Sequence, residues 1–452
     1  MHRLLLATGL AVATAGPVSA NELIRVFELA EQNDTVFQAA RHQRDAAIEA
    51  RPQARAALLP QLNASAFETR GTTTNTFTTV DQGSGQPVTI EQENDGGSNG
   101  WTVSASLSVY DHANWLRFSQ AGDTVAAAQA QYRAAEQDLA LRTVTAYFNV
   151  LGARDTLRFA TAENRAVERQ LEQAKKRFEV GLSAITDVHE AQARYDLTVS
   201  QKLDAEQALQ NARDALVEVT GVPLENYAPL REDIPLAGPN PEDVQAWIDT
   251  ALENNLSLIA ARYNEKIAAK DKRINRAGHY PTLTLTGAEF YRESTQFIPG
   301  AGNFPNEAEG NQVTLTLDLP IFSGGLTQSR VRQAHSTLLQ RQAELTGTRR
   351  SVERQVRNAY QGVITGVSRV KALKQAVVSN TTALDASETG LKVGARTAVD
   401  VLNAQRELFR AQRDYARARY DYLINVLQLK QAAGQLMFKD VLEIDRLLVA
   451  GG

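Results

Sequence analysis

The sequence predicts a mixed α+β membrane protein in which one unit of long helices and strands occurs twice. Three observations lead to this fold class: landmarks that repeat at a fixed spacing, two very long stretches without proline, and segments in which apolar and polar residues alternate. Alternation with a period of two is typical of strands, whereas apolar residues spaced by three and four are typical of helices. Only 13 of the 452 residues are proline, which favours long helices.

The chain opens with a segment typical of export. Met1–Arg3 is basic, Leu4–Ala15 is apolar but too short to cross a bilayer, and Val18–Ala20 offers small residues to a signal peptidase. We therefore predict a signal peptide over residues 1–20 and a mature start near Asn21, with a buried N-terminal helix as the alternative. No later stretch reaches about 20 continuous apolar residues, so any bilayer crossing must use strands.

Composition argues against several classes of function. The formal net charge is -4 and the 48 basic residues are scattered, which makes nucleic-acid binding improbable. The chain has no cysteine, and its six histidines are far apart. Neither an HExxH, nor a phosphate-binding loop, nor a nucleophile elbow is present. We expect no enzyme activity, no catalytic residue, no metal and no cofactor.

An internal duplication organises the chain. A shift of 213 residues superposes several landmarks: Ala146-Tyr147 on Ala359-Tyr360, Gly181 on Gly394, Asp187-Val188 on Asp400-Val401, Ala191-Gln192 on Ala404-Gln405, and Gly221 on Gly434. Upstream, the offset is 221 for the strand after Pro60 and 210 for the strand at Val103. We predict a first repeat over 21–221, a proline-rich linker over 222–241, a second repeat over 242–434 and an irregular tail over 435–452.

Each repeat is predicted to contain two strands joined by a polar loop. The predicted strands cover about 60–71, 99–110, 281–293 and 311–320, where apolar and polar residues alternate. The segments 71–99 and 294–310 between them are rich in Thr, Gly, Asn and Glu and are predicted to be solvent-facing loops. A soluble sandwich also alternates, so the strands alone leave that alternative open.

Each repeat is also predicted to contain a long helical hairpin, over 113–221 and 325–434. The second hairpin carries apolar residues spaced by threes, fours and sevens, a coiled-coil pattern that needs partners along its length: Leu345, Val352, Val356, Val363, Val367, Val370, Leu373, Val377, Leu384 and Leu391. Gly181 and Gly394 fit helix C-terminal positions with positive φ. The helices are predicted to fold back there.

Four strands are too few to close a membrane barrel, because open edges leave backbone groups unsatisfied in lipid. The chain is therefore expected to associate. Three copies supply twelve strands, enough for a barrel with a lumen, and twelve long helices that continue the wall as a coiled-coil tube. We predict a homotrimer.

Two pairs of segments resemble the TolC family of outer-membrane factors. They are Phe178–Val188 with Val393–Ala404, and Ala146–Leu151 with Ala418–Asn425. The resemblance covers nearly the whole mature chain, including the duplication. It implies a trimeric outer-membrane channel of a Gram-negative bacterium that serves as the exit duct of an efflux pump or a type I secretion system.

The resemblance also implies the architecture and the partners of such a duct. A β-barrel in outer-membrane lipid continues as a periplasmic α-barrel that tapers to a closed entrance. A periplasmic adaptor and an inner-membrane pump, of the RND or the ABC type, dock on this entrance. The implied docking tips are the turns Gly181-Leu182-Ser183 and Gly394-Ala395-Arg396.

Polar links hold the entrance of the family shut, and the matching positions here are Thr186, Asp187 and Arg396. A charge-assisted hydrogen bond from arginine contributes roughly 1.5 to 3 kcal/mol. The alternative is that Asp187 caps its helix and Arg396 is solvated. A tyrosine that takes part in the family's link is replaced by Leu391, so the closed state is expected to differ in one contact.

Asp400 matches a carboxylate that lines the narrowest part of the duct and favours cations. A second carboxylate position of the family is Asn403 here, which halves the expected ring charge. The alternative for Asp400 is a helix-start carboxylate. For the whole chain, the rival class is a periplasmic coiled-coil adaptor, which shares the hairpins and the signal peptide but not the duplicated strands.

Overall fold

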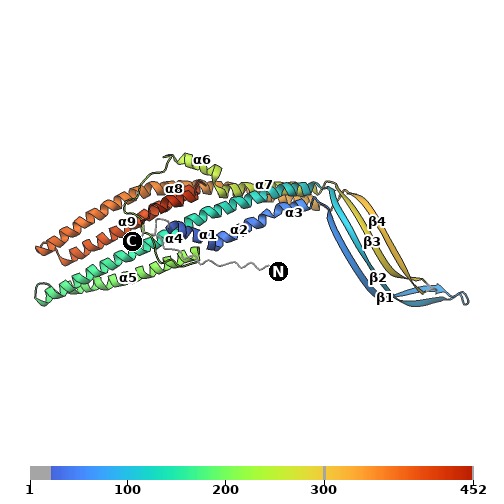
Figure 1. The fold of residues 1–452 in the computed structure, drawn as a ribbon, viewed down its shortest axis with the longest axis horizontal. Helices are drawn as coiled ribbons and strands as arrows, with labels where there is room; N and C mark the ends of the chain where they lie inside the picture. The colour runs from blue at the N-terminus through green and yellow to red at the C-terminus, as the bar shows by residue number, and fades with distance from the viewer. Residues whose placement is uncertain (1–21, 299–301, 450–452) are drawn as a thin grey trace, which may run out of the picture. The chain divides into compact units, whose positions relative to one another are not determined.

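The structure is a computed structural model that describes residues 22–298 and 302–449 (Figure 1). The predicted signal peptide and the mature start at Asn21 lie outside the described residues. The chain divides into two compact units. The helical unit contains the described residues up to Arg44, then Gln129–Ala260, and those from Leu345 onward. The sheet unit contains Asp45–Ala128 and Ala261–Glu344.

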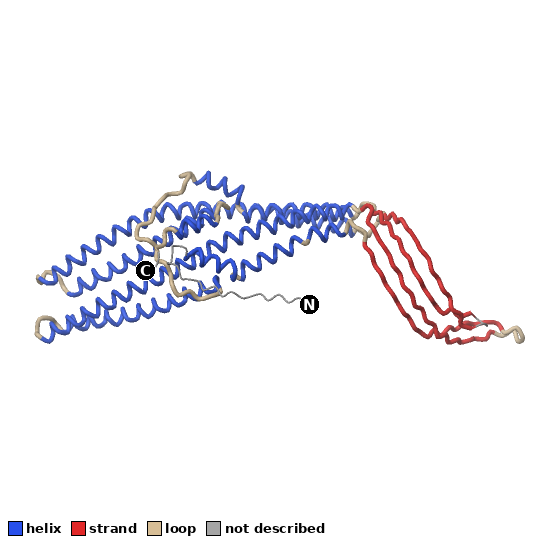
Figure 2. The backbone as a smooth tube through the Cα atoms, in the orientation of Figure 1, coloured by secondary structure: helices blue, strands red, loops and turns tan. Residues whose placement is uncertain are grey.

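The sheet unit is built on one antiparallel sheet of four strands in the order β1-β2-β3-β4 (Figures 1 and 2). The strands are β1 (Gln61–Val80), β2 (Pro87–Tyr110), β3 (Thr282–Ile298) and β4 (Gly302–Asp318). The four predicted strands are therefore confirmed. Since spatial order follows chain order, β1 and β4 form the two edges.

The strands extend well beyond their predicted ends, and the prediction of long loops was wrong. Segment 71–99 contributes to both β1 and β2, so the first connection is reduced to residues 81–86. Segment 294–310 likewise belongs mostly to β3 and β4. Two antiparallel strands satisfy each other's backbone groups, and β-branched threonine favours the extended state. A strand with a paired neighbour can therefore continue where apolar and polar residues no longer alternate. The predicted strand ends were wrong because they were placed where that alternation stops.

Helical segments of the sheet unit are joined to one another by polar contacts. They include α3 (Ala50–Ala56), part of α7 (Leu256–Ala277) and the first turns of two longer helices. Lys270 Nζ lies 2.6 Å from Asp123 Oδ2, and Gln120 Nε2 donates to Asp271 Oδ1 at 2.6 Å. These contacts connect segments about 150 residues apart in the sequence.

Two long hairpins dominate the helical unit (Figures 1 and 2). In the first, α4 (His112–Glu179) returns as α5 (Ile185–Thr220); in the second, α8 (Leu326–Lys392) returns as α9 (Ala398–Ala432). At 1.5 Å per residue, α4 and α8 each extend roughly 100 Å. The predicted hairpins are confirmed to within a few residues at each end.

Among the described helices, none combines the length and the apolar character that crossing a membrane requires.

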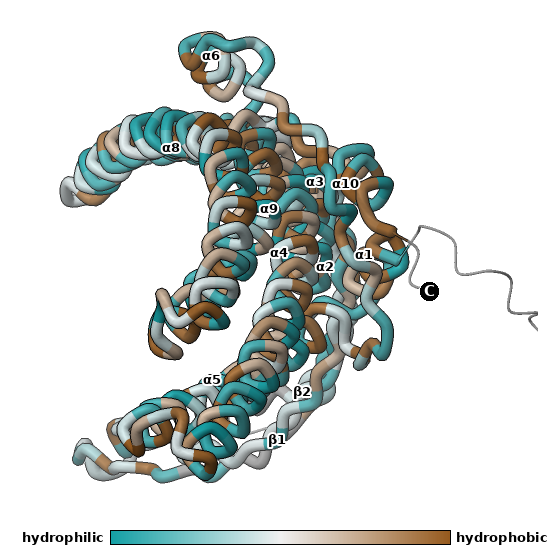
Figure 3. The backbone as a smooth tube through the Cα atoms, turned by 90° about the vertical axis from the view of Figure 1, so that its left-hand side faces the viewer, coloured by the Kyte–Doolittle hydropathy of each residue, from teal (hydrophilic) through white to brown (hydrophobic). Residues whose placement is uncertain are grey.

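The predicted coiled-coil pattern of α8 is buried over only part of its length. Val352, Val356, Val363 and Val370 are buried, each 3% exposed or less. Toward the turn, Val377, Leu384 and Leu391 are only half-buried. Figure 3 shows hydrophobic and hydrophilic residues mixed along the long helices. The part of α8 nearest the turn therefore needs further neighbours.

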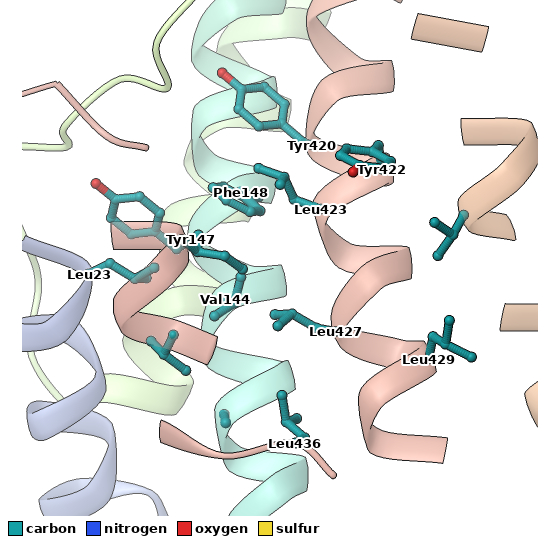
Figure 4. Close-up of a cluster of buried hydrophobic side chains, with 14 of the residues drawn as sticks. Leu23, Val144, Tyr147, Phe148, Tyr420, Tyr422, Leu423, Leu427, Leu429 and Leu436 are labelled. Carbon is teal, nitrogen blue, oxygen red and sulfur yellow. The ribbon is translucent and has the colours of Figure 1, made fainter. Parts of the chain in front are cut away.

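An apolar core joins both hairpins to the short helices (Figure 4). Tyr147 and Phe148 of α4 pack with Leu423 and Leu427 of α9 and with Leu23 of α1 (Glu22–Asn33). Also in the helical unit are α6 (Val244–Asn254) and most of α2 (Thr35–Ile48). The core therefore holds the two hairpins together at the ends that lie far from their turns.

The linker and the tail lie beside this core. Residues 222–241 contain no helix, and Tyr147 Oη donates to the Ala228 carbonyl at 3.1 Å. The tail is not wholly irregular as predicted, because it contains α10 (Phe438–Asp445). The Leu23 N–H donates to Asp445 Oδ1 at 3.0 Å, which joins α10 to the start of α1. Eight residues are too few to display helical periodicity in the sequence.

Candidate gate and docking turns at the hairpin ends

The first hairpin reverses direction over residues 180–184. Gly181 has φ of 73°, a conformation that costs glycine little and other residues much. Its N–H donates to the Phe178 carbonyl at 2.9 Å, and the Leu182 N–H donates to the Arg177 carbonyl at 2.7 Å. These bonds satisfy carbonyls at the end of α4. The Leu182 side chain is left 70% exposed, and Ser183 is half-buried.

The second hairpin reverses direction in a similar way over residues 393–397. Gly394 has φ of 77°, and the Ala395 N–H donates to the Gly390 carbonyl at 2.8 Å. Positive φ was predicted at both glycines and is confirmed. Figures 1 and 3 show the two turns apart from each other at the ends of the hairpins.

The start of α9 is fixed by a capping box. Thr397 Oγ1 accepts from the Asp400 N–H at 3.2 Å, and Asp400 Oδ2 accepts from the Thr397 N–H at 2.9 Å. The two residues thus satisfy each other's backbone donors. The sequence alternative for Asp400, a helix-start carboxylate, is therefore present in the structure.

The same contacts keep Asp400 ionised. Hydrogen bonds from the Thr397 backbone and hydroxyl hold the pKa of Asp400 below its ordinary value, and the nearby Arg396 guanidinium adds to the effect. Hydrogen bonds to a carboxylate favour its charged form. Asp400 therefore carries a full negative charge at neutral pH.

The start of α5 has no equivalent cap. Its N-cap residue is Ala184, which makes no side-chain hydrogen bond to the helix. Thr186 is exposed and Asp187 is half-buried in the first turn. The alternative in which Asp187 caps its own helix is thus not what the structure shows. Its carboxylate remains uncommitted within the described chain.

Arg396 lies against a glycine that sequence reasoning missed. A Cβ atom on Gly390 would lie only 2.6 Å from Cγ of Arg396, so the arginine side chain passes directly over this helical glycine. The Arg396 N–H also donates to the Gly390 carbonyl at 3.2 Å. The absence of a Cβ at Gly390 therefore leaves room for the Arg396 side chain to lie against the end of α8. The sequence offers one hint of this contact: Gly390 lies six residues before Arg396, and a tight turn separates them.

The structure does not bring the predicted gate residues together within one chain. Among the described residues, no hydrogen bond or ion pair joins Arg396 to Thr186 or Asp187. Leu391 is half-buried in the last turn of α8, and Asn403 is exposed on α9. Any link between these polar groups must therefore form between neighbouring hairpins in a different arrangement or a different copy.

A buried ion pair in the first hairpin also escaped sequence reasoning. Arg194 of α5 lies 2.8 Å from Glu163 Oε1 of α4, with side chains only 16% and 11% exposed. Glu163 lies 18 residues before Gly181 and Arg194 lies 13 residues after it, so equal spacing from the turn could not have paired them in the sequence. The pair fixes α5 against α4 well away from the turn.

Burial raises the pKa of Glu163, and Arg194 opposes this shift only in part. Arg413 and Arg406 of α9 are close enough to act in the same sense as Arg194. Removing a carboxylate from water disfavours its charged form, whereas nearby cations favour it. Glu163 is therefore an electrostatic contact between the first hairpin and α9.

No group of three or more His, Asp or Glu side chains able to hold a metal occurs in the described part of the chain.

Comparison with known proteins identifies the chain. The sequence profile described as "Outer membrane efflux protein" matches residues 26–222 and 247–435, which is well over half of the sequence. The chain belongs to this outer membrane efflux protein family. The two matched segments fall on the two predicted repeats.

Two relatives show the family at high coverage. Outer membrane protein TolC of Vibrio cholerae is 38% identical over 429 residues, covering 95% of this chain and 94% of that protein. The alkaline protease secretion protein AprF of Pseudomonas aeruginosa is 30% identical, covering 95% and 88%. The resemblance to TolC stated from the motifs is therefore confirmed.

A solved structure supports the fold. The CmeC outer membrane channel of Campylobacter jejuni has a TM-score of 0.74 at 17% identity and covers 98% of this chain and 95% of its own. The family assignment makes the protein an outer-membrane exit duct for efflux and type I secretion systems, extending into the periplasm. AprF of Pseudomonas aeruginosa and PrtF of Dickeya chrysanthemi are both named as protease secretion proteins. The rival prediction of a periplasmic adaptor is not supported, and the family is one of channels, consistent with no enzyme activity.

Proposed function

We propose that three copies of the chain close one barrel of twelve strands in the outer membrane. One observation carries this proposal: the sheet has four strands and two open edges, β1 and β4. An open edge exposes unpaired N–H and C=O groups, which is costly in lipid. Pairing β4 of each copy with β1 of the next removes every edge.

The helices favour the same assembly. Four long helices per copy, twelve in the trimer, continue the barrel as a periplasmic tube. Val377 and Leu384 of α8 are half-buried in one chain although they continue the apolar pattern of Val352 and Val356. Neighbouring copies supply the remaining cover, as in coiled coils. Outer-membrane lipid surrounds the strands only.

The adaptor docks on the two turns of each copy. The turns are the ends of the longest helices, and they expose apolar side chains, Leu182 at 70% and Val393 at 74%. The docking residues are Gly181, Leu182, Ser183, Gly394, Ala395 and Arg396. An inner-membrane pump of the RND or ABC type completes the export path.

The closed entrance is held by Arg396 of one hairpin and by Thr186 or Asp187 of a neighbouring hairpin. Arg396 is exposed, and the Asp187 carboxylate is not used to cap α5. Both groups are therefore free to pair when the hairpins approach. A charge-assisted bond of roughly 1.5 to 3 kcal/mol is strong enough to close an entrance and weak enough for a partner to open it.

Asp400 forms a ring of three carboxylates about the axis that favours cations. Its charge is maintained by the capping box, and Asn403 contributes no charge to the ring. Rings of carboxylates select cations by raising their local concentration. Block by divalent or trivalent cations should depend on Asp400 alone.

Single-channel recording in lipid bilayers separates the two roles. Arg396→Ser should raise the conductance severalfold because it removes the link but leaves the ring. Asp400→Ala should weaken cation preference and abolish block by multivalent cations without a comparable rise in conductance. Unchanged conductance in Arg396→Ser, or strong block in Asp400→Ala, would place the constriction elsewhere. Native mass measurement in detergent checks the trimer.

A further inference from the structure

The two edges of the sheet end in apolar residues that one chain leaves uncovered. Leu62 lies at the start of β1 and is 74% exposed. Ile321 and Phe322 follow the end of β4 and are 92% and 87% exposed. Large apolar side chains that are exposed next to one another, as Ile321 and Phe322 are, indicate a contact with another surface. A comparison of the two repeats indicates which surface covers these residues.

The pairing registers of β1 with β2 and of β3 with β4 define which residues of the two repeats correspond. Pairing begins at Gln61 opposite Ser106 in the first hairpin and at Thr282 opposite Asp318 in the second. Matching these pairs relates β1 to β3 by 221 residues and β2 to β4 by 212. The offset of 210 expected from the sequence differs from this value by two residues, because a pattern with a period of two fits both shifts.

With this correspondence, the end of β2 has a neighbouring strand on the side where the end of β4 has none. β2 continues past Ser106 to Tyr110 because β3 lies beside it, with Leu107 opposite Leu285 and Tyr110 opposite Leu283. The residues that correspond to 107–110 are 319–322. In one chain they form no strand. A strand placed beside β4 as β3 is placed beside β2 would extend it in the same way.

We propose that this strand is β1 of a second copy, and that Phe322 packs opposite Leu62 of that copy. The inference rests on the trimeric barrel proposed above and adds its register. Transferring the β2–β3 pairs places Leu319 opposite Ala64 of the second copy, and Phe322 opposite its Leu62. Two of the most exposed apolar side chains of the sheet unit thereby cover each other.

Pro320 fits this register. A proline cannot donate to a ladder and is tolerated within a sheet only at an edge or a bulge. The β2–β3 ladder has a register shift between Ser108 and Tyr110. The corresponding positions at the edge of β4 are Pro320 and Phe322. The register shift transferred from the β2–β3 ladder therefore lies at Pro320, where the missing N–H of proline is tolerated.

Disulfide cross-linking tests the register, because the chain has no cysteine of its own. Two double variants carry the proposed pairs: Leu62→Cys with Phe322→Cys, and Ala64→Cys with Leu319→Cys. Two pairs are used because neighbouring pairs in an antiparallel ladder differ in Cα separation, and only some suit a disulfide. The control is Leu62→Cys with Pro320→Cys, the pair that the offset of 210 requires.

After mild oxidation of outer membranes, at least one proposed pair should give covalent dimers and trimers in denaturing gels, and the control pair should give far fewer. Efficient cross-linking of the control, or of neither proposed pair in a protein that native mass measurement shows to be trimeric, would overturn the register but not the trimer. A monomer by native mass would overturn both. Each single-cysteine variant, analysed in the same gel, excludes links between identical positions.

Discussion

The two helical hairpins share a backbone but are stabilised by different polar contacts. Both turn at a glycine with positive φ, Gly181 and Gly394. With the repeat offset of 213, the capping residue Thr397 corresponds to Ala184, and its partner Asp400 corresponds to Asp187. The second hairpin forms a capping box and the first does not. One missing hydroxyl therefore leaves one carboxylate free.

The situation is reversed farther from the turns. The buried pair Glu163 with Arg194 stabilises the first hairpin, whereas the corresponding residues of the second are Ala376 and Glu407. At corresponding positions of the two predicted repeats, the turn geometry is therefore the same and the charges differ. The Glu163 pair with Arg194 therefore contributes to the first hairpin alone, and the capping box at the start of α9 contributes to the second alone.

The largest effect is expected from Arg194→Ala. It leaves Glu163 buried without its partner, and breaking a buried ion pair typically costs about 3 to 5 kcal/mol. Hydrogen exchange of α4 and α5 should accelerate. Burial raises the pKa of Glu163, and losing Arg194 removes a contribution that lowers it, so the pKa should rise further in the variant. Protonation relieves the defect, so the loss of stability should shrink as the pH falls through this raised pKa.

Two controls accompany this variant. Glu407→Ala, at the corresponding position of the second hairpin, should change stability little because Glu407 is 42% exposed in its ion pairs. The double variant Glu163→Met with Arg194→Met should recover most of the loss, since apolar replacement of a buried pair is often neutral. A double variant as unstable as Arg194→Ala would mean that packing, not charge, holds the first hairpin.

Valine at either turn glycine should have the next largest effect. Gly181→Val and Gly394→Val force a β-branched residue into positive φ, at a local cost of about 1 to 3 kcal/mol. Export should fall while trimer insertion stays intact. Gly347→Val is the matched control, because this glycine lies within α8 without positive φ and has open space around its Cβ direction. Normal export by both turn variants would argue against docking at the turns.

Exchanging the capping residues should sharpen the comparison. Ala184→Thr supplies the missing hydroxyl, so a capping box with Asp187 should form and stabilise the start of α5 by about 1 kcal/mol. It should also withdraw Asp187 from Arg396 and raise single-channel conductance. Thr397→Ala should destabilise the start of α9 by a similar amount. Hydrogen exchange of the two first turns measures both changes, and unaltered exchange in either variant would contradict the capping argument.

The smallest effect concerns pH. Asp400 has a depressed pKa, so its charge persists to a lower pH than that of an ordinary aspartate. Thr397→Ala removes the bond from the threonine hydroxyl and should raise that pKa. Cation preference, measured as reversal potential across a salt gradient, should then disappear at a higher pH than in the unaltered channel. Identical pH profiles would show that Thr397 does not control the Asp400 charge.

The sequence by itself determined the parts of this protein that depend on local pattern. Long stretches without proline located α4 and α8, apolar spacing supported α8, and the repeat predicted Gly181 and Gly394 at equivalent turns. These features follow from backbone geometry, which a few adjacent residues specify. The family motifs lie at the same turns, so the outer-membrane duct could be identified without coordinates.

Only the tertiary structure decided the contacts between distant residues. The length of β1 and β2 depends on each strand pairing with the other, not on its own composition. The Glu163 pair with Arg194 and the passage of Arg396 over Gly390 depend on how two helices meet across a turn. A periodic sequence pattern fits equally well after a shift by one period, and for this reason the offsets of 210 and 212 between β2 and β4 both fit the alternation. A register is fixed only when both partners are in place.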